Sequence, residues 1–147
     1  MISTELAARL RDAGLVWRPA DGDRFRIDAP ELSDDVFTVS TMTIQAHEFP
    51  TGTILGFNGT TEWALDSVAI EDALWLPRED QLRDLLRSTF LGLRRTTPDD
   101  AQDDAQDGGR DRYEVDVELL GERRTFAADD PAEAYGGALL ALVELTS

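Results

Sequence analysis

The chain has no cysteine, no lysine and a single histidine, His47, among its 147 residues. Without cysteine it can form no disulfide, no thiolate zinc site and no thiol nucleophile. Without lysine it has neither the phosphate-binding lysine of a P-loop nor a Schiff-base lysine. These absences remove many of the common catalytic and metal-binding arrangements.

Other catalytic patterns are missing as well. No serine lies in a G-x-S-x-G elbow. His47 stands beside Glu48 in a strand-like segment, and neighbouring strand residues point to opposite faces, so we interpret His47 as a surface or hydrogen-bonded strand residue. The aspartates of residues 99–107 lack the central glycine and closing glutamate of an EF-hand loop. We therefore expect no catalytic residue, no metal site and no cofactor.

Basic charge is scarce and scattered. The formal net charge is −16, and all 14 basic residues are arginines, mostly placed beside acids. A protein that binds nucleic acid or an anionic membrane needs a clustered basic face, so neither partner is expected. No apolar stretch reaches about 20 residues, and Met1–Glu5 has no basic region of a signal peptide. We expect a soluble, cytoplasmic protein of bacterial type.

Periodicity predicts an α+β fold that opens with an N-terminal helix. Ser3 suits its N-cap, Leu6 and Leu10 share a face, and Gly14 suits its end. Residues 24–66 then change to a period of two, which predicts an antiparallel β-meander of four or five strands, interrupted by a turn at residues 49–52. Asn58-Gly59 indicates a type I′ hairpin turn before a return strand over 60–66; the alternative is a helical turn at 61–65.

An amphipathic helix is predicted over residues 77–95. Pro77 suits a first helical position. Leucines and Phe90 recur at helical spacing, and Arg94 and Arg95 fall where cations complement the helix dipole. Residues 96–111 contain Pro, Asp, Gln, Ala and Gly but no large apolar residue, and we interpret them as an acidic flexible linker.

The C-terminal part reads as a ββα unit. Apolar and acidic residues alternate along 113–119, Gly121 marks a turn, and residues 130–133 resemble a capping box with proline at N1. Gly136 and Gly137 interrupt the last helix, and we favour their close approach to the sheet over an oligomer contact. We therefore expect a core of residues 1–95, a linker of 96–111, and a unit of 112–147 that packs on the core or on a second subunit.

Two nearby segments, residues 57–67 and 75–82, are dense in polar and aromatic side chains. In the first interpretation their tryptophans belong to the core and their acids complement a helix dipole. In the second, polar side chains form a rim around an aromatic floor that binds a peptide or a small ligand. The candidate binding residues are Asn58, Glu62, Trp63, Asp66, Trp75 and Arg78.

The same two segments also resemble the motifs of a protein family. Residues 57–68, FNGTTEWALDSV, and 74–82, LWLPREDQL, resemble motifs of a family of small, uncharacterised actinobacterial proteins, and the likeness extends over most of the chain. Some members carry the name of a pilus assembly protein, which fits a much larger ATPase. This chain has no P-loop and no lysine, so the resemblance implies a shared fold and neither an activity nor catalytic residues.

Three functional hypotheses remain. The first is a non-catalytic protein-binding or regulatory module, favoured because the tested catalytic arrangements lack their reactive groups. The second is a small-ligand-binding protein or carboxylate-based enzyme with a site around Glu62, Asp66 and Trp75. The third is a structural homodimer joined through the C-terminal ββα unit.

Overall fold

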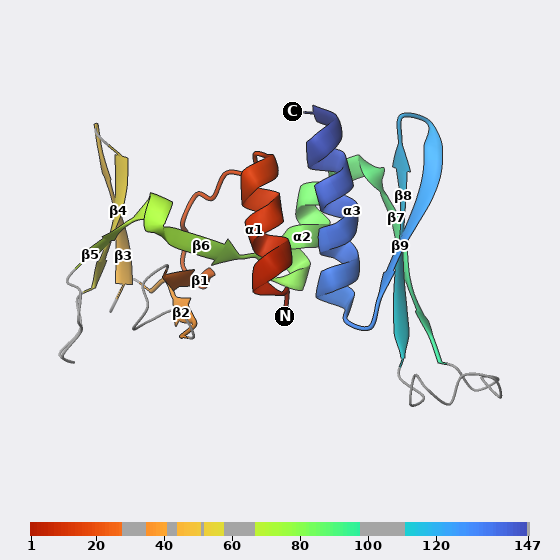
Figure 1. Cartoon of the computed structure of the whole chain (residues 1–147), viewed down its shortest axis with the longest axis horizontal. Coiled ribbons are helices and arrows are strands. Elements are labelled where there is room, and N and C mark those ends of the chain that lie inside the picture. The colour runs from red at the N-terminus through yellow and green to blue at the C-terminus, as the bar shows by residue number, and fades with distance from the viewer. Residues whose placement is uncertain (28–34, 41–43, 51, 58–66, 98–110, 147) are drawn as a thin grey trace. The chain divides into compact units, whose positions relative to one another are not determined.

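The computed structural model describes residues 1–27, 35–40, 44–50, 52–57, 67–97 and 111–146 (Figure 1). This part of the chain is α+β, with three α-helices and three antiparallel sheets of three strands each. It divides into two compact units, one formed by Met1–Leu15 with Arg78–Ser147 and the other by Val16–Pro77. Each unit is described by itself below.

The first unit contains all three described α-helices and one sheet. Its elements are α1 (Thr4–Ala13), α2 (Glu79–Leu86), the 3-10 helix η2 (Arg87–Thr89), β7 (Phe90–Thr96), β8 (Arg112–Leu119), β9 (Glu122–Ala128) and α3 (Pro131–Thr146). Strands pair in the order β7-β8-β9. Helix α3 packs against β8 and β9 and also against α1 and α2, so it lies between α1 and the sheet (Figure 1).

The N-terminal helix begins and ends where the sequence predicts. The Ser3 hydroxyl accepts a hydrogen bond from the backbone N–H of Leu6 at 3.2 Å. Gly14 ends the helix at φ 119°, a left-handed conformation that glycine adopts without a Cβ penalty. Ala7 and Leu10 are buried on the face that the apolar spacing predicted.

The start of α3 is tied to the start of α1. Asp130 Oδ1 accepts the Ala132 N–H at 2.7 Å, and Asp130 Oδ2 accepts from the Met1 ammonium at 2.9 Å. Asp130 therefore caps α3 as predicted. Glu133, however, accepts the Ser3 N–H at 2.8 Å, so this acid, which lies in the same turn as Asp130, links α3 to the start of α1.

The glycine pair in α3 serves two different contacts. A Cβ placed on Gly136 would lie 2.6 Å from Leu6 Cδ2, whereas one on Gly137 would lie 3.7 Å from Phe126 Cδ1. Gly136 thus allows close packing of α3 on α1, and only Gly137 faces the sheet. The expectation that both glycines approach the sheet was wrong for Gly136.

The predicted helix over 77–95 is much shorter than expected. Helix α2 ends at Leu86, Arg87 takes φ 54°, and Phe90–Thr96 forms β7. Leu82 and Leu86 are buried as the helical pattern requires. Phe90 instead pairs with Val117 across the sheet. Pairing with a strand more than 20 residues away along the chain overrides the local helical spacing.

The expected C-terminal ββα unit is confirmed as β8, β9 and α3, which ends at Thr146. Leu120 and Gly121 form a two-residue turn, with φ 51° and 80° respectively. Tyr135, Ala138 and Leu139 are buried on α3. β7, which lies before the expected linker, completes the sheet, and residues 98–110 of that linker lie outside the described residues.

The second unit consists of two small antiparallel sheets. Their strands are β1 (Arg24–Ile27), β2 (Phe37–Thr38), β3 (Ile44–Phe49), β4 (Gly52–Phe57), β5 (Ser67–Ala69) and β6 (Ala73–Leu76), with the 3-10 helix η1 (Ile70–Asp72) before β6. The sheet orders are β2-β1-β6 and β3-β4-β5. The predicted meander is therefore split over two sheets, because β1 pairs with β2 and β6.

The turn after Phe49 lies where it was predicted, since Phe49 pairs with Gly52. The Asn58-Gly59 turn, the expected return strand over 60–66 and the alternative helical turn all lie outside the described residues. In the described chain β4 pairs with β3 on one side and with β5 on the other.

Candidate functional site

Four of the six predicted binding residues, Asn58, Glu62, Trp63 and Asp66, lie outside the described residues. The other two belong to different units: Trp75 lies in β6 of the second unit, and Arg78 is the N-cap of α2 in the first. The Arg78 backbone N–H donates to Gln81 Oε1 at 2.9 Å, and its Nε donates to Asp80 Oδ1 at 3.1 Å. Arg78 therefore takes part in the start of a helix.

Trp75 lies in an aromatic row that crosses one face of the β2-β1-β6 sheet. Phe25 pairs with Phe37 on one side and with Trp75 on the other. The Phe25 and Phe37 ring centroids are 5.5 Å apart. Trp17 stacks on Trp75 at 6.4 Å and an interplanar angle of 10°. Phe25 is fully buried and both tryptophans are half-buried, so the row belongs to the core of this unit.

A buried carboxylate holds Trp17 in place. Asp23, only 2% exposed, accepts from Trp17 Nε1 and from the Ala20 N–H, both at 3.0 Å. Among the described residues Trp75 has no such acceptor: its Nε1 atom is buried and makes no hydrogen bond with them. A buried donor without a partner costs on the order of 1–3 kcal/mol. The aromatic row therefore contains one unsatisfied polar group.

A second polar cluster lies on the sheet of the first unit. Along β8, Val115, Val117 and Leu119 are buried on the face that α3 covers, and the residues between them point to the other face. We call this the outer face of the sheet. Within the described chain no helix packs on it (Figure 1).

Asp116 is the centre of the outer face. It is 3% exposed, although no helix covers it. The Thr125 hydroxyl donates to its Oδ1 at 2.6 Å, and Arg123 Nη2 donates to its Oδ2 at 3.1 Å. Arg94 reaches the same Oδ2 through Nη1 and Glu114 Oε1 through Nη2, the latter at 3.1 Å. One carboxylate thus joins all three strands.

These contacts fix the ionisation of Asp116. The hydrogen bond from the Thr125 hydroxyl lowers the pKa of Asp116, and the guanidinium groups of Arg123 and Arg94 lower it further against the opposing effect of burial. Asp116 is therefore a carboxylate at neutral pH and holds two arginines at fixed positions on an exposed sheet face. At neutral pH Asp116 therefore has no proton to donate as a general acid.

The edge strands of this sheet also carry exposed apolar side chains and further arginines, and Leu93, Arg95 and Arg124 lie on the face opposite Asp116. Leu91 and Leu93 of β7 are 48% and 37% exposed. Arg95 pairs with Asp111 at 2.7 Å, and the Arg124 guanidinium lies 5.0 Å from the centre of the Phe126 ring. The mixture of arginine and apolar groups is typical of protein interfaces.

Sequence reasoning predicted part of this site. The alternation in 113–119 placed Glu114, Asp116 and Glu118 on one polar face, as observed. It missed the roles of Arg94 and Arg123, because Arg94 was expected at the end of a helix. The signal that could have found them was the Arg94-Arg95 pair directly after Phe90-Leu91-Gly92-Leu93, since glycine is unfavourable inside a helix.

His47 lies in β3, paired with Ile54. Among the described residues no three acidic or histidine side chains gather as metal ligands. No helix in the described part of the chain is both long and apolar enough to cross a membrane. Compared with known proteins, the chain matches no family model, no curated protein and no solved structure.

Proposed function

We propose that this chain is a non-catalytic protein-binding or regulatory module of the bacterial cytosol. Its partner docks on the outer face of the β7-β8-β9 sheet and on the edge strand β9. The observation that carries this proposal is Asp116, a buried carboxylate that holds Arg94 and Arg123 in place on a sheet face that no described helix covers.

The energetic argument concerns preorganisation. An arginine that becomes ordered on binding loses rotamer entropy, which weakens the complex. Arg94 and Arg123 are already anchored to Asp116, so a partner meets two oriented guanidinium groups with unused N–H donors. Arginine is also enriched among the residues that contribute most to protein interfaces.

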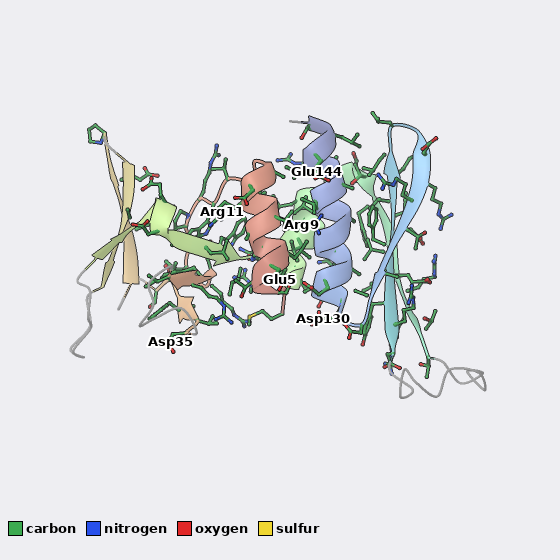
Figure 2. All side chains as sticks on the ribbon, in the orientation of Figure 1. Glu5, Arg9, Arg11, Asp35, Asp130 and Glu144 are labelled. Carbon is green, nitrogen blue, oxygen red and sulfur yellow. The ribbon has the colours of Figure 1, made fainter. Side chains whose placement is uncertain are left out.

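Site-specific photocrosslinking tests the proposal. A photoreactive benzoylphenylalanine at Ala127, an exposed residue of β9, should capture the same partner repeatedly in extracts of the native host. The matched control carries the crosslinker at Glu5, an exposed residue of α1 (Figure 2). Capture at Ala127 that disappears with Asp116→Asn, and absence of that partner at Glu5, are the expected results. Equal capture at both positions would contradict the proposal.

The unsatisfied Trp75 indole favours a second candidate function, a small-ligand site around Glu62, Asp66 and Trp75. A ligand oxygen that accepted the Trp75 N–H would satisfy a donor that the described chain leaves unpaired. A thermal-shift screen of metabolites compares wild type with Trp75→Phe, which lacks this donor. The ligand hypothesis predicts a compound that stabilises wild type and leaves the variant unchanged. A screen without such a compound would contradict it.

A further inference from the structure

Strand β9 offers an open edge. It pairs with β8 through seven consecutive residue pairs, from Leu119↔Glu122 to Tyr113↔Ala128, without a bulge. Its other side pairs with no strand of the described chain. Glu122 to Thr125 and Ala127 are exposed. A regular, exposed edge of this kind can accept an additional strand.

The turn before β9 determines which backbone groups face outward. A two-residue turn is closed by a hydrogen-bonded pair, here Leu119 with Glu122, and hydrogen-bonded and non-hydrogen-bonded pairs then alternate along the ladder. By this alternation the backbone N–H and C=O of Arg123, Thr125 and Ala127 point away from β8. They are the groups that an added strand would bind.

Two adjacent arginines lie on this edge and face opposite sides of the sheet. Arg123 lies on the outer face, where Nη2 donates to Asp116. Arg124 lies on the other face, with its guanidinium over the Phe126 ring and no ion pair in the described chain. A guanidinium has five N–H donors, so both arginines retain donors for a further acceptor.

The opposite edge, β7, is less suitable for an acidic partner. Its pairing with β8 is interrupted by a bulge between Phe90 and Gly92. Arg94 already binds Asp116 and Glu114, and Arg95 binds Asp111. An incoming carboxylate would meet these acids at β7, whereas at β9 Arg123 binds one acid, Asp116, and Arg124 forms no ion pair within the described residues.

We propose that β9 binds an extended acidic segment of a partner protein as an added strand, with two adjacent carboxylates on Arg123 and Arg124. This inference rests on the proposed function and specifies the chemistry of the partner. Neighbouring residues of a strand point to opposite faces, so two consecutive acidic residues reach both arginines. A second copy that paired through its own β9 fits less well, because that strand would bring one acid, Glu122, and two further arginines to this edge.

The direct test is a peptide titration followed by fluorescence anisotropy at low salt. The probe is a labelled, end-blocked peptide of sequence Thr-Val-Glu-Glu-Val-Thr-Thr, and its comparison replaces both glutamates by glutamine. Two exposed charge pairs should make the glutamate peptide bind about fivefold more tightly than the glutamine peptide, a preference that weakens as salt is raised. Equal affinities would overturn the inference.

Variants locate the binding. Arg124→Glu should abolish the preference for the glutamate peptide and favour the same peptide with lysine in place of both glutamates. Arg11→Glu makes the same charge change on α1 and should leave the preference for the glutamate peptide intact. Ala127→Pro removes an outward N–H without breaking the β8 ladder and should abolish binding. Ala127→Thr keeps that N–H and should bind normally. Circular dichroism confirms that each variant is folded.

The outcomes separate this inference from the proposed function. If crosslinking at Ala127 captures a partner but the glutamate and glutamine peptides bind equally well, the proposal of a binding module stands and the proposal of an acidic partner is wrong. If Ala127→Pro leaves peptide binding unchanged, the added strand is wrong. If sedimentation shows a dimer that Ala127→Pro converts to a monomer, the edge binds a second copy and the inference is overturned.

Discussion

Replacing the two glycines of α3 separately should give opposite effects on stability. Gly137→Ala adds a Cβ at an ordinary contact distance, 3.7 Å from Phe126 Cδ1. It should stabilise the first unit by about 0.5–1 kcal/mol, because alanine favours helix more than glycine does. Gly136→Ala adds a Cβ 2.6 Å from Leu6 Cδ2 and 3.3 Å from Ile2 Cδ1.

The Gly136 substitution brings the same helical gain but must also displace Leu6. Carbon atoms in contact normally lie about 3.5–4.0 Å apart, and overpacking of this kind costs about 1–3 kcal/mol. The closest atom is the end of a flexible side chain, so we expect the lower half of that range. The difference between the two variants equals this overpacking cost, about 1–2 kcal/mol. After the helical gain is subtracted, Gly136→Ala should lose about 0.5–1 kcal/mol of stability.

Urea unfolding can follow this effect in one unit. All described α-helices belong to the first unit, whereas Trp17, Trp63 and Trp75 all lie within 16–77. Circular dichroism at 222 nm therefore reports mainly the first unit, and tryptophan fluorescence reports the second. The Gly136 variant should lower the midpoint of the first signal and leave the second unchanged.

Leu6→Ala provides the matched control. It removes the atom that the new Cβ meets, so the double variant should be about 1 kcal/mol more stable than the sum of the two single changes predicts. If Gly136→Ala stabilises the protein as much as Gly137→Ala, or if the double variant is simply additive, the close packing of α1 on α3 is refuted.

Three further predictions concern polar contacts and a turn. Because the pKa of Asp116 is lowered, its contribution is complete above the unfolded-state pKa of about 3.9 and is lost as pH falls through the lower folded-state value. Asp116→Asn should therefore lower the free energy of unfolding by about 1–3 kcal/mol at pH 7. In urea unfolding measured over a range of pH, the variant should also lose less stability in acid than wild type does. Leu120→Asn should stabilise by about 1 kcal/mol in thermal unfolding, since Leu120 has φ 51° and is 85% exposed. Asp130→Ala should lower the free energy of unfolding by about 1 kcal/mol at pH 7, because the α3 cap is lost. Burial raises the pKa of Asp130, but the Met1 ammonium and the Ala132 N–H lower it overall. The cost of the substitution should therefore shrink in acid, where Asp130 becomes protonated.

Local signals predicted the elements whose ends are set by nearby residues. Ser3 and Gly14 define α1 through a side-chain cap and a left-handed glycine. The alternation in β8 likewise identified its buried and polar faces. Both depend on residues a few positions apart, which is the range over which sequence patterns are informative.

The errors arose where distant residues decide the structure. Phe90 fits the helical stripe of α2 equally well, but pairing with Val117 makes it part of a strand. Gly136 was assigned to the sheet because nothing in the sequence indicates that α1 lies against α3. The Asp116 cluster was missed for the same reason, since Arg94 and Asp116 meet only after that strand has formed.

The order in which the two units can form follows from their boundaries. Residues Val16–Pro77 are contiguous, so a ribosome releases the whole second unit before α3 has been translated. Helix α1 is translated before the second unit but packs on α3, which is translated after it. During translation the buried face of α1, with Leu10, therefore lacks its partner until α3 has been translated. A nascent chain stalled after residue 77 should expose this helix to chaperones and proteases. Translation of the sixteen residues of α3 should remove that exposure.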